Sequence, residues 1–449
     1  MIRYFKVRNY GSIRDERVLD MEATDDATLE DYYCVTARDA ERREPVRLLK
    51  LAVLYGPNAS GKSTVLEALE AFRDLHLQPN QKKHEEIGVY NPFLFDGRSG
   101  GEPTELELDF FVKDRDSGDY VEYRYTVKFD RRYILEERLL HWPNHREAEV
   151  FSRTTDLDAE LSRISWGSTV KDDQKYKDGL ELHTIPNVTV LGAYSGVNAR
   201  IDALEKVSAW MRERWMPGIG PKTRLFEWAK RQIRNEEGGR AILRELINKA
   251  DFHINDFDVV EEDAPTEALK KLLDAFGRED DRREGIKDAK MLRADFEHTV
   301  RHQGEERRYT LSERRESGGT RRFVGLGAVI QKMILGHRDL ATIDEVETSL
   351  HVDLLKHYIL VFLRNTGESQ LICTTHDVSL LRERDMLRED AVWFTEKQDD
   401  GTTDLFCLSD FDSRTFRKGS SIYNAYMNGK LGAKPNLGSA HIDKTGLDD

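Results

Sequence analysis

The pattern of apolar positions predicts a strand, a loop and a helix near the start of the chain. Residues 2–10 alternate apolar and basic side chains, and residues 48–55 (LLKLAVLY) are short and apolar enough for a buried strand. Directly afterwards, Val65, Leu69 and Phe72 recur at helical spacing. The pattern then changes again, because residues 105–112 and 121–130 alternate with period two around the turn-rich DRDSGD. They predict an antiparallel hairpin.

The middle of the chain, residues 142–304, is highly charged and predicts an inserted, mainly helical module. The segments PGIGP and EEGG separate helical patterns at residues 203–215, 225–235 and 241–250. Within this region, the run GREDDRREGIK (277–287) is a solvated loop on the simplest interpretation, with a specific binding role as the alternative.

Helices and strands alternate again in the last third, which favours a parallel sheet and an α/β fold. A helical pattern begins at Phe323, an apolar strand ends at Ile343, a helix follows Leu350, and residues 371–375 form another strand. Two further strands are predicted at residues 391–395 and 404–408, and a short helix at 420–431.

Composition narrows the class of protein. The chain has 449 residues, of which 39% are hydrophobic and 34% charged, as in a folded protein rather than a disordered one. A formal net charge of −14 argues against non-specific coating of nucleic acid, although a local basic face can coexist with it. Cys34, Cys373 and Cys407 lack zinc-site or disulfide spacing, and no apolar run reaches the roughly 20 residues that span a bilayer. We expect a cytoplasmic protein without a membrane segment.

The stretch GPNASGKST (56–64) carries the strongest chemical signal. It satisfies G-x-x-x-x-G-K-[ST] between a predicted strand and a predicted helix. Such glycines turn backbone N–H groups towards phosphate oxygens, while Lys62 would neutralise the β and γ phosphates and Ser63 would reach Mg²⁺. The alternative, a flexible Gly/Ser turn, is disfavoured by the flanking elements. The candidate ATP-binding residues are Gly56, Pro57, Asn58, Ala59, Ser60, Gly61, Lys62, Ser63 and Thr64.

Two adjacent carboxylates follow the strand that ends at Ile343. Asp344 would hold Mg²⁺, and Glu345 would polarise the water that attacks the γ-phosphate. An Asp-Glu pair alone could equally be a solvated acidic turn. The functional interpretation therefore depends on the presence of the P-loop in the same chain. His376, at the end of LICTTHD, would bring an imidazole near the γ-phosphate, although a lone histidine is more often structural. The candidate catalytic residues are Glu345, His376 and Lys62.

A second anion-binding helix start is predicted at ESGGT (316–320). Because one chain has one P-loop and one such start, the two would meet a γ-phosphate most naturally across a two-fold dimer with ATP between the subunits. The alternative is an ordinary serine N-cap at Ser317. Ser349 and His351 also have two interpretations, a place at the dimer seam or a helix cap.

In order, GPNASGKST, ESGGTRR, IDEVETSLH and TTHD resemble the motifs of ATP-binding-cassette ATPases of the SMC, RecF and OLD kind. More narrowly, three stretches are similar to the AAA15 family ATPases: the opening FKVRNYGSIRD, the segment NPFLFDG, and the ending VWFTEKQDDGTTDLFCLSDF with YNAYMNGKLGAKPNL. That group contains RloA-like proteins and ATPase subunits of bacterial anti-phage systems, including the PARIS type. The similarity covers both terminal thirds and is loose in the middle.

The resemblance implies an ATP-binding-cassette-type P-loop NTPase head, with a mixed sheet and an antiparallel β subdomain. Residues 1–141 and 305–449 would be its two parts, with the helical module 142–304 inserted between them. It also implies ATP and Mg²⁺ as cofactors. By matching motifs, the resemblance assigns Gly56, Gly61, Lys62, Ser63 and Thr64 to Walker A, Ser317, Gly319 and Thr320 to the signature, Asp344 and Glu345 to Walker B, and His376 to the switch histidine. NPFLFDG (91–97) lies where a Q-loop is usual but contains no glutamine.

Two enzymatic functions are compatible with these motifs, and a third, non-enzymatic one overlaps the first: a nucleotide-gated scaffold that binds ATP and hydrolyses it slowly. The first is a regulatory ATPase of an anti-phage system, which controls a separately encoded TOPRIM-, RloB- or nuclease-like effector through ATP-dependent dimers or larger homo-oligomers, with a phage protein or nucleic acid as trigger. The second is a RecF-like DNA-repair ATPase, whose basic stretches around residues 212–214, 231–234 and 307–308 would follow phosphates. A solvated helical face is the simpler interpretation of those stretches.

Overall fold

The described residues form two compact units. The computed structural model describes residues 1–38, 44–114, 117–142, 146–171, 173–235, 237–250, 253–263, 290–412, 416 and 420–435. The first unit is drawn from Met1–Gly218, Asp339–Val346 and Glu368–Asp449, and the second from Ile219–Arg338 and Glu347–Gly367. The loop predicted at residues 277–287 lies outside the described residues. None of the helices in the described ranges is long and apolar enough to cross a bilayer.

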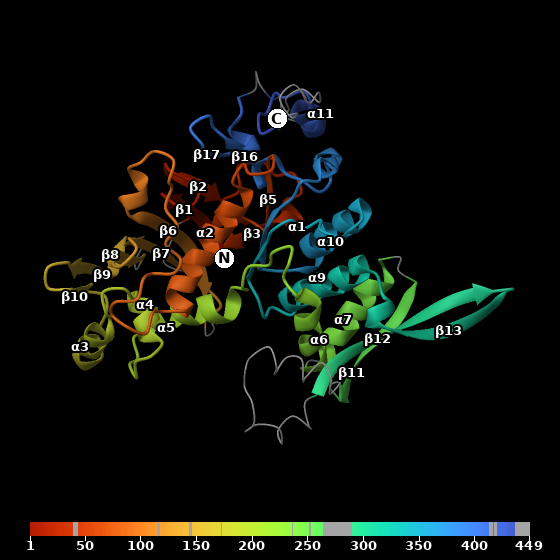
Figure 1. Cartoon of the computed structure of the whole chain (residues 1–449), viewed down its shortest axis with the longest axis horizontal. Coiled ribbons are helices and arrows are strands. Elements are labelled where there is room, and N and C mark those ends of the chain that lie inside the picture. Colours follow the sequence, from red (N-terminus) through yellow and green to blue (C-terminus); the bar gives the residue numbers. More distant parts are fainter. Residues whose placement is uncertain are drawn as a thin grey trace, which may run out of the picture. The chain divides into compact units, whose positions relative to one another are not determined.

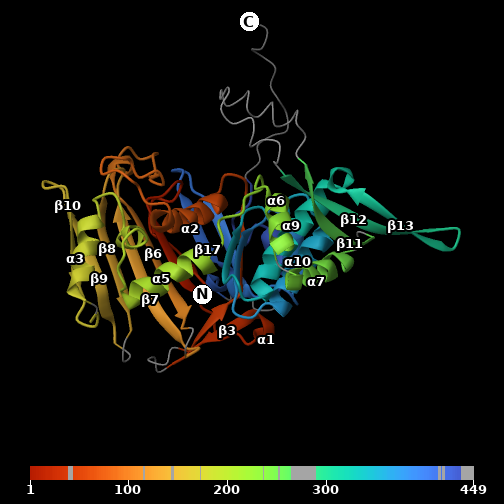
Figure 2. The ribbon, with the colours of Figure 1, turned by 90° about the horizontal axis from the view of Figure 1, so that it is seen from below.

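A seven-stranded antiparallel sheet forms one layer of the first unit (Figure 2). The predicted hairpin around DRDSGD lies inside it and is confirmed, with Phe110 opposite Tyr123. Its strands follow the order β10-β9-β8-β7-β6-β1-β2. Their bounds are β1 Ile2–Arg8, β2 Arg17–Asp20, β6 Thr104–Lys113, β7 Tyr120–Phe129, β8 Ile134–His141, β9 Ala148–Asp156 and β10 Leu161–Trp166.

A five-stranded sheet, in the order β14-β15-β5-β16-β17, forms the second layer. Its first four strands run parallel to their neighbours, and only the pairing of β16 with β17 is antiparallel, so the predicted parallel sheet is confirmed. All five residues of β5 are buried, as the apolar run predicts for a central parallel strand. The bounds are β5 Leu51–Tyr55, β14 Leu340–Ile343, β15 Gln370–Thr374, β16 Val392–Lys397 and β17 Thr403–Cys407.

The apolar run 48–55 is two strands rather than the single predicted one. Strand β4 (Val46–Leu49) pairs with β3 (Cys34–Ala37), and β5 begins after Lys50. The Lys50 N–H donates to the Tyr33 carbonyl at 2.9 Å, while the Lys50 carbonyl accepts from the Leu371 N–H at 2.8 Å. The chain therefore passes at Lys50 from one sheet to the other without a loop, which composition alone does not reveal.

Helix α2 (Lys62–Leu77) packs on the antiparallel sheet through the predicted apolar face. The ring of Phe72 lies edge-on to Phe5 at 6.1 Å and to Tyr125 at 5.6 Å, centroid to centroid. These contacts hold the helix that follows β5 against the sheet; Figure 1 shows the course of α2 and β5. The remaining helices of the unit are α1 Glu30–Tyr33, α3 Gln174–His183, α4 Val190–Tyr194, α5 Asp202–Ala209 with a π-helical turn at Trp210–Arg214, and α11 Ile422–Met427.

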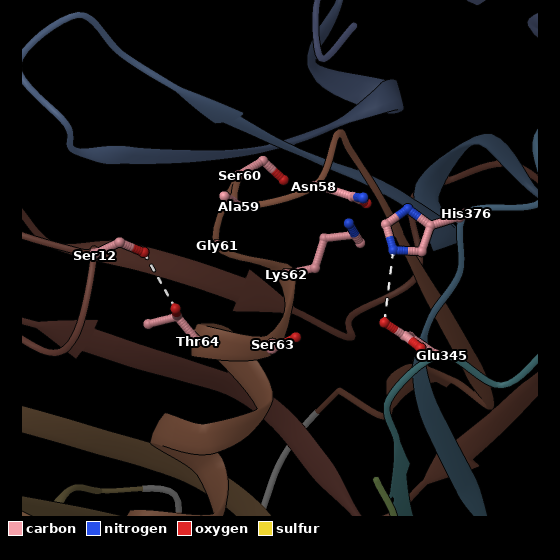
Figure 3. Close-up of a pocket in the computed structure, with 10 residues that line it drawn as sticks. All are labelled: Ser12, Asn58, Ala59, Ser60, Gly61, Lys62, Ser63, Thr64, Glu345 and His376. Atoms are coloured by element: carbon pink, nitrogen blue, oxygen red, sulfur yellow. Dashed lines mark hydrogen bonds and ion pairs between the residues drawn. The ribbon is translucent and has the colours of Figure 1, made fainter. Parts of the chain in front are cut away.

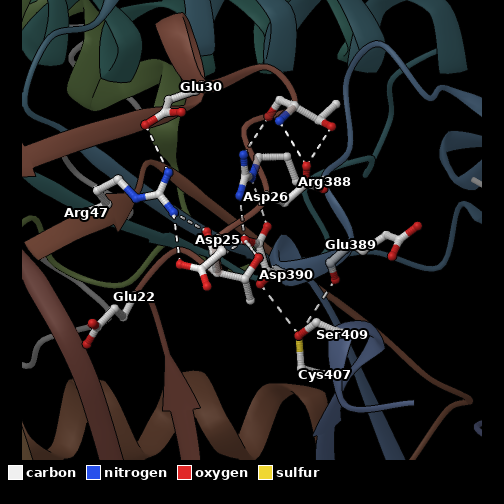
Figure 4. Close-up of polar contacts among 12 residues, drawn as sticks. Glu22, Asp25, Asp26, Glu30, Arg47, Arg388, Glu389, Asp390, Cys407 and Ser409 are labelled. Carbon is white, nitrogen blue, oxygen red and sulfur yellow. Dashed lines mark hydrogen bonds and ion pairs between the residues drawn. The ribbon is translucent and has the colours of Figure 1, made fainter. Parts of the chain in front are cut away.

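A buried ion pair joins the C-terminal part of the first unit to its N-terminal part (Figure 4). The Arg388 guanidinium donates to both oxygens of Asp390 at 2.9 and 2.6 Å, and both side chains are almost fully buried. Asp390 also accepts from the Thr24 N–H at 3.0 Å and from its hydroxyl at 2.8 Å. Removal of either charge would leave the other buried and uncompensated, which is strongly destabilising.

The second unit packs helices on a three-stranded antiparallel sheet of β11 (Ile254–Asp263), β12 (Lys290–His302) and β13 (Glu305–Ser312). Its central helix is α9 (Gly318–Ile334). Two glycines of α9 permit close approach, because a Cβ at Gly325 would lie 2.9 Å from Leu225 and a Cβ at Gly327 would lie 2.6 Å from Leu243. Other helices among the described residues of this unit are α6 Leu225–Asn235, α7 Glu237–Asn248 and α10 Val352–Asn365.

The strands correct the expected composition of residues 142–304. Helices occur there as predicted, but β9 and β10 extend the seven-stranded sheet, and β11 and β12 form most of the sheet of the second unit. The first boundary between compact units follows Gly218 rather than residue 141. Residues 142–304 are highly charged because they contain partly exposed strands as well as helices. The change in composition at residue 142 therefore does not mark the end of the seven-stranded sheet. The boundaries proposed for a split head stay a prediction.

Candidate functional site

Three loops meet at one edge of the parallel sheet in the first unit. Register pairs Leu54 of β5 with Thr374 of β15, and Cys373 of β15 with Ile343 of β14. The three strands therefore end side by side, and the loops that follow them are the P-loop, the Asp-Glu pair and the segment that holds His376. Ligands of open α/β sheets bind at the carboxyl ends of the strands, which is this edge.

The loops surround a cavity of about 670 Å³. The side chains of Lys62, Glu345 and His376 converge on it, and His376 Nε2 lies 3.9 Å from Glu345 Oε1 (Figure 3). The structure thus brings together residues that the sequence separates by more than 280 positions. The lining consists of Ser12, the P-loop residues Asn58, Ala59, Ser60, Gly61, Lys62, Ser63 and Thr64, and Glu345 and His376.

Packing behind the P-loop requires its two glycines. A Cβ at Gly61 would lie 2.2 Å from Thr403 Oγ1, and a Cβ at Gly56 would lie 2.5 Å from Thr395 Oγ1. Gly61 also has φ +103°, and Ala59 has φ +62°, so the loop bends through left-handed backbone conformations. The loop is therefore held from behind by β16 and β17 while its front faces the cavity.

Lys62 lies across the mouth of the P-loop. Its Nζ donates to the carbonyls of Gly56 at 2.9 Å and of Pro57 at 3.0 Å, and the residue is 5% exposed. The ammonium group is thus held at the loop where a phosphate would be cradled. A phosphate oxygen would offer it a charged acceptor in place of neutral carbonyls, and charge-assisted hydrogen bonds are the stronger kind.

The Ser63 hydroxyl and the Asp344 carboxylate form a pair that fits a magnesium ion. Ser63 Oγ donates to Asp344 Oδ2 at 2.8 Å. The other oxygen, Oδ1, accepts from Thr374 Oγ1 at 2.5 Å, and Thr374 Oγ1 in turn accepts from the Glu345 N–H at 2.8 Å. Mg²⁺ usually takes one or two protein carboxylates and completes its shell with waters and substrate phosphates, so this hydroxyl and carboxylate suit it. Thr374 positions both members of the Asp-Glu pair.

Asp344, which follows β14, is close enough to Glu67 of α2 for the two carboxyl groups to interact. Burial, and then the negative charge of Asp344, raise the pKa of Glu67 above its usual value. Protonation of Glu67 is therefore easier than for an exposed glutamate, which lowers the repulsion that Asp344 meets. The direction of the shift in the pKa of Glu67 is the one expected for a carboxyl group beside a carboxylate.

Four polar residues of the site were not found from the sequence. Ser12 lines the cavity, its Oγ lies 3.2 Å from Thr64 Oγ1, and it accepts from Thr403 Oγ1 at 2.7 Å. Thr395 Oγ1 lies 2.5 Å from Ser60 Oγ, and Thr374 holds the Asp-Glu pair. Isolated serines and threonines carry no spacing signal. The one available hint was Thr374 itself, which precedes His376 by two residues in TTHD.

The predicted signature belongs to the second unit, where it begins α9. Ser317 is the N-cap, and its Oγ accepts from the Thr320 N–H at 2.9 Å and lies 2.8 Å from Thr320 Oγ1. Ser317 and Gly318 are exposed, so the start of the helix is open to solvent. Gly319 lies close to the backbone, because a Cβ there would be 2.7 Å from the Ser349 carbonyl oxygen. The N-cap interpretation is therefore present in the structure, and the role in phosphate binding stays a prediction.

Ser349 and His351 lie in the turn before α10. His351 is the N-cap of that helix, and its Nδ1 accepts from the Asp353 N–H at 3.2 Å. Ser349 has φ +64°, in the left-handed region. The helix-cap alternative is thus what the structure shows for His351, while a place at a dimer seam stays a prediction for both residues.

Comparison with known proteins identifies one family model. The family described as "AAA domain, putative AbiEii toxin, Type IV TA system" matches residues 51–190 and 210–382. The matched ranges contain the P-loop, the signature, the Asp-Glu pair and His376. Together with the order of the parallel sheet, the match confirms the predicted fold class, an ATP-binding-cassette-type P-loop head with an antiparallel β subdomain. No curated protein matches the chain.

Solved structures of SMC heads are also similar to the chain. The SMC head domain from Thermotoga maritima has 11% identity and a TM-score of 0.38, with 90% of this chain and 98% of that chain covered. An Smc head bound to the C-winged helix domain of ScpA has 13% identity and a TM-score of 0.41, with 90% and 97% covered. An Smc head with an extended coiled coil, bound to the C-terminal domain of ScpA derived from Pyrococcus furiosus, has 11% identity and a TM-score of 0.40, with 96% and 99% covered.

Proposed function

The chain belongs to this family of AAA domains, whose model covers well over half of it, and from that premise we propose that it binds and hydrolyses ATP. One observation carries the proposal: the Ser63 hydroxyl lies 2.8 Å from the Asp344 carboxylate. The same unit contains the cavity that Lys62, Glu345 and His376 line. A flexible Gly/Ser turn would not account for a P-loop serine bonded to an acidic residue 281 positions away.

Each residue has a distinct role in this proposal. Lys62 and the P-loop amides bind the β and γ phosphates. Ser63 and Asp344 would hold Mg²⁺, which would neutralise the negative charge that develops on the phosphate during transfer. The Glu345 carboxylate orients a water and accepts its proton, and His376 donates a hydrogen bond near the γ-phosphate. The 3.9 Å between His376 Nε2 and Glu345 Oε1 leaves both side chains able to turn into the cavity.

We place the second half of the ATP site on another copy of the chain. The exposed start of α9 offers backbone amides and the Ser317 hydroxyl, the donors suited to a γ-phosphate. In the proposed homodimer, each P-loop faces the signature of its partner, and two ATP molecules lie between the subunits. Larger homo-oligomers can be built from such dimers.

Substitution of Ser317 separates the helix-cap role from the phosphate role. Aspartate is as good an N-cap as serine, but its negative charge repels a phosphate. For Ser317→Asp we expect unchanged thermal stability and ATP binding, with ATP-dependent dimers and turnover reduced at least about tenfold. For Ser317→Ala we expect a loss of about 1 kcal/mol of stability from the cap. Parental turnover in Ser317→Asp, measured by phosphate release, would remove the signature from the mechanism.

The biological role that we propose is control of a separately encoded effector in an anti-phage defence system. The description of the family, which links its AAA domain to a toxin and a type IV toxin–antitoxin system, supports this role. So does the resemblance of the two terminal thirds to AAA15 ATPases of the RloA and PARIS type. ATP-driven assembly would hold or release a TOPRIM-, RloB- or nuclease-like effector, and a phage protein or nucleic acid would be the trigger.

Purification of the chain from its native cells tests this role. We expect a second protein with a nuclease-like fold to co-purify, identified by mass spectrometry, and to dissociate when ATP is exchanged for ADP. Recovery of the chain with DNA, and DNA-stimulated turnover that falls steeply with salt, would instead favour the RecF-like alternative. The ion pairs disfavour that alternative, since Arg234 pairs with Glu261, and Arg308 lies 3.3 Å from Glu297.

A further inference from the structure

A second cavity, of about 700 Å³, lies entirely within the second unit. Helix α6, the start of α9 and the turn before α10 surround it. Its lining is unusually rich in guanidinium groups, because both helices turn arginines towards it. The lining includes four arginines, a tryptophan and the first glycine of α9: Arg224, Arg231, Arg321, Arg322, Trp228 and Gly318.

The residues that line this cavity carry a net positive charge. Within the described part of the chain, Arg224, Arg231 and Arg321 make no ion pair. The carboxylates that also line the cavity, Glu227 and Glu313, are both bonded to the Lys230 ammonium, at 3.1 and 2.8 Å. The lining therefore carries five positive charges, four of them guanidinium groups, against two carboxylates, which leaves a net charge of +3.

The buried side chain of Arg322 is an independent indication that this cavity binds an anion. The residue is 8% exposed, and its Nε and Nη2 have no hydrogen-bond partner among the residues that the structure describes, while Nη1 makes one long contact of 3.5 Å to the Gly220 carbonyl. Burial accordingly lowers the pKa of its guanidinium. Buried donors of a charged group without acceptors are costly, and a phosphate satisfies a guanidinium through two parallel hydrogen bonds. Gly318 brings the N-terminal end of the 17-residue helix α9 to the same cavity.

An aromatic surface lies beside the cations. Trp228 is partly exposed, and its ring stacks on no aromatic or cationic partner among the described residues. Phe226, by contrast, already stacks on Phe296 at 6.3 Å, centroid to centroid. An indole next to arginines provides a stacking platform for a nucleobase together with charge for its phosphate.

We propose that this cavity is a second nucleotide site, in which Arg224, Arg231, Arg321 and Arg322 hold a terminal phosphate and Trp228 stacks on the base. A terminal phosphate carries more negative charge than an internal phosphodiester, which suits four arginines. The same chemistry is presented by a free nucleoside monophosphate and by the 5′-phosphorylated end of a single strand. This site is separate from the P-loop cavity, which contributes no residue to it.

The test uses the full chain with Lys62→Ala, so that the P-loop does not contribute to the signal. AMP and a 5′-phosphorylated oligothymidylate are titrated by equilibrium dialysis, with the unphosphorylated oligonucleotide as reference. We expect saturable binding of at least one phosphorylated probe, and about tenfold weaker binding in Arg224→Gln and in Arg231→Gln, which lose one charge-assisted hydrogen bond each. Trp228→Phe should retain binding that Trp228→Ala loses. Binding of AMP alone identifies a free nucleotide as the ligand, and binding of the oligonucleotide identifies a strand end.

Arg244→Gln is the matched control. Arg244 is a 45% exposed arginine of the same unit, paired with Asp256 at 2.8 Å and outside the cavity, so its loss should leave both affinities unchanged. Melting curves of all variants exclude unfolding. The proposal is overturned if neither phosphorylated probe binds, if the unphosphorylated oligonucleotide binds equally well, or if Arg224→Gln and Arg231→Gln bind like Arg244→Gln. It is also overturned if those two variants impair only ATP-dependent dimers, because the cavity would then be part of the ATP site between subunits.

Discussion

Lys62→Ala is expected to weaken ATP binding about 100-fold or more, measured by equilibrium dialysis with labelled ATP. The Lys62 ammonium is held at the P-loop by the carbonyls of Gly56 and Pro57, so it needs little reorganisation to meet a phosphate. Hydrogen bonds from a charged donor contribute about 1.5–3 kcal/mol each, and alanine removes all of those made by Nζ. Turnover should be lost with binding, because Lys62 also neutralises charge on the transferred phosphate.

The same substitution leaves two carbonyls of the P-loop without this donor, so a change in the loop itself has to be excluded. Thermal melting should show that Lys62→Ala is folded, with a loss of about 1–3 kcal/mol at most, because the hydrogen bond to the Gly56 carbonyl is buried. Lys82→Ala, which removes an exposed lysine elsewhere in the first unit, is the matched control and should bind ATP normally. Unchanged ATP affinity in Lys62→Ala would refute the assignment of the P-loop.

The sequence indicates candidate site residues most clearly where the motif depends on short spacing. The P-loop was found because its glycine-rich motif has a fixed spacing. The Asp-Glu pair was found because it directly follows a strongly apolar strand. Their meeting follows from the parallel sheet, since strands β5, β15 and β14 are neighbours and end at one edge. The sequence predicted Ser63 and Asp344 as ligands of one magnesium ion; the two side chains are 2.8 Å apart, and their role at the metal stays a prediction.

The sequence could not predict features that depend on long-range packing. Thr374, Thr395 and Thr403 hold the site through single hydroxyl groups, and a single hydroxyl has no periodicity. Strands β9 and β10 lie in a charged region because the sheet leaves much of their surface exposed, so composition indicated helices there. Lys50 lies inside the run 48–55 that was predicted as one strand, although it is the point where the chain changes sheets.

The position of Glu345 depends on one of these unpredicted residues. Its backbone has φ +47°, a left-handed conformation that a non-glycine residue adopts only when its surroundings impose it. The hydrogen bond from the Glu345 N–H to Thr374 Oγ1 holds that conformation, and the same hydroxyl orients Asp344. Asp344, the proposed metal ligand, and Glu345, the proposed base, are thus positioned by one threonine. A substitution that changes only the chemistry of Glu345 should therefore leave Asp344 in place.

Glu345→Gln is such a substitution, and we expect it to separate ATP binding from hydrolysis. Glutamine keeps the size and the backbone hydrogen bond of Glu345 but cannot accept a proton, and a general base contributes about 100- to 10,000-fold to a rate. Phosphate release should therefore fall by about that factor, while ATP affinity stays within about twofold because no contact with phosphate is removed. Since hydrolysis would normally open the dimer, the variant should elute as an ATP-dependent dimer or larger assembly from a sizing column.

The control for Glu345→Gln removes a carboxylate of the first unit that has no place in the cavity. Glu368 is 43% exposed and pairs with Lys113 at 2.6 Å, just before β15 begins, whereas the ATP cavity lies where β15 ends. Glu368→Gln should hydrolyse ATP at the parental rate and should not accumulate as a dimer, because an exposed pair contributes at most about 1 kcal/mol. Parental turnover in Glu345→Gln would instead show that another group accepts the proton. Loss of turnover without a trapped assembly would mean that hydrolysis takes place within one copy of the chain, and the signature would then have no part in it.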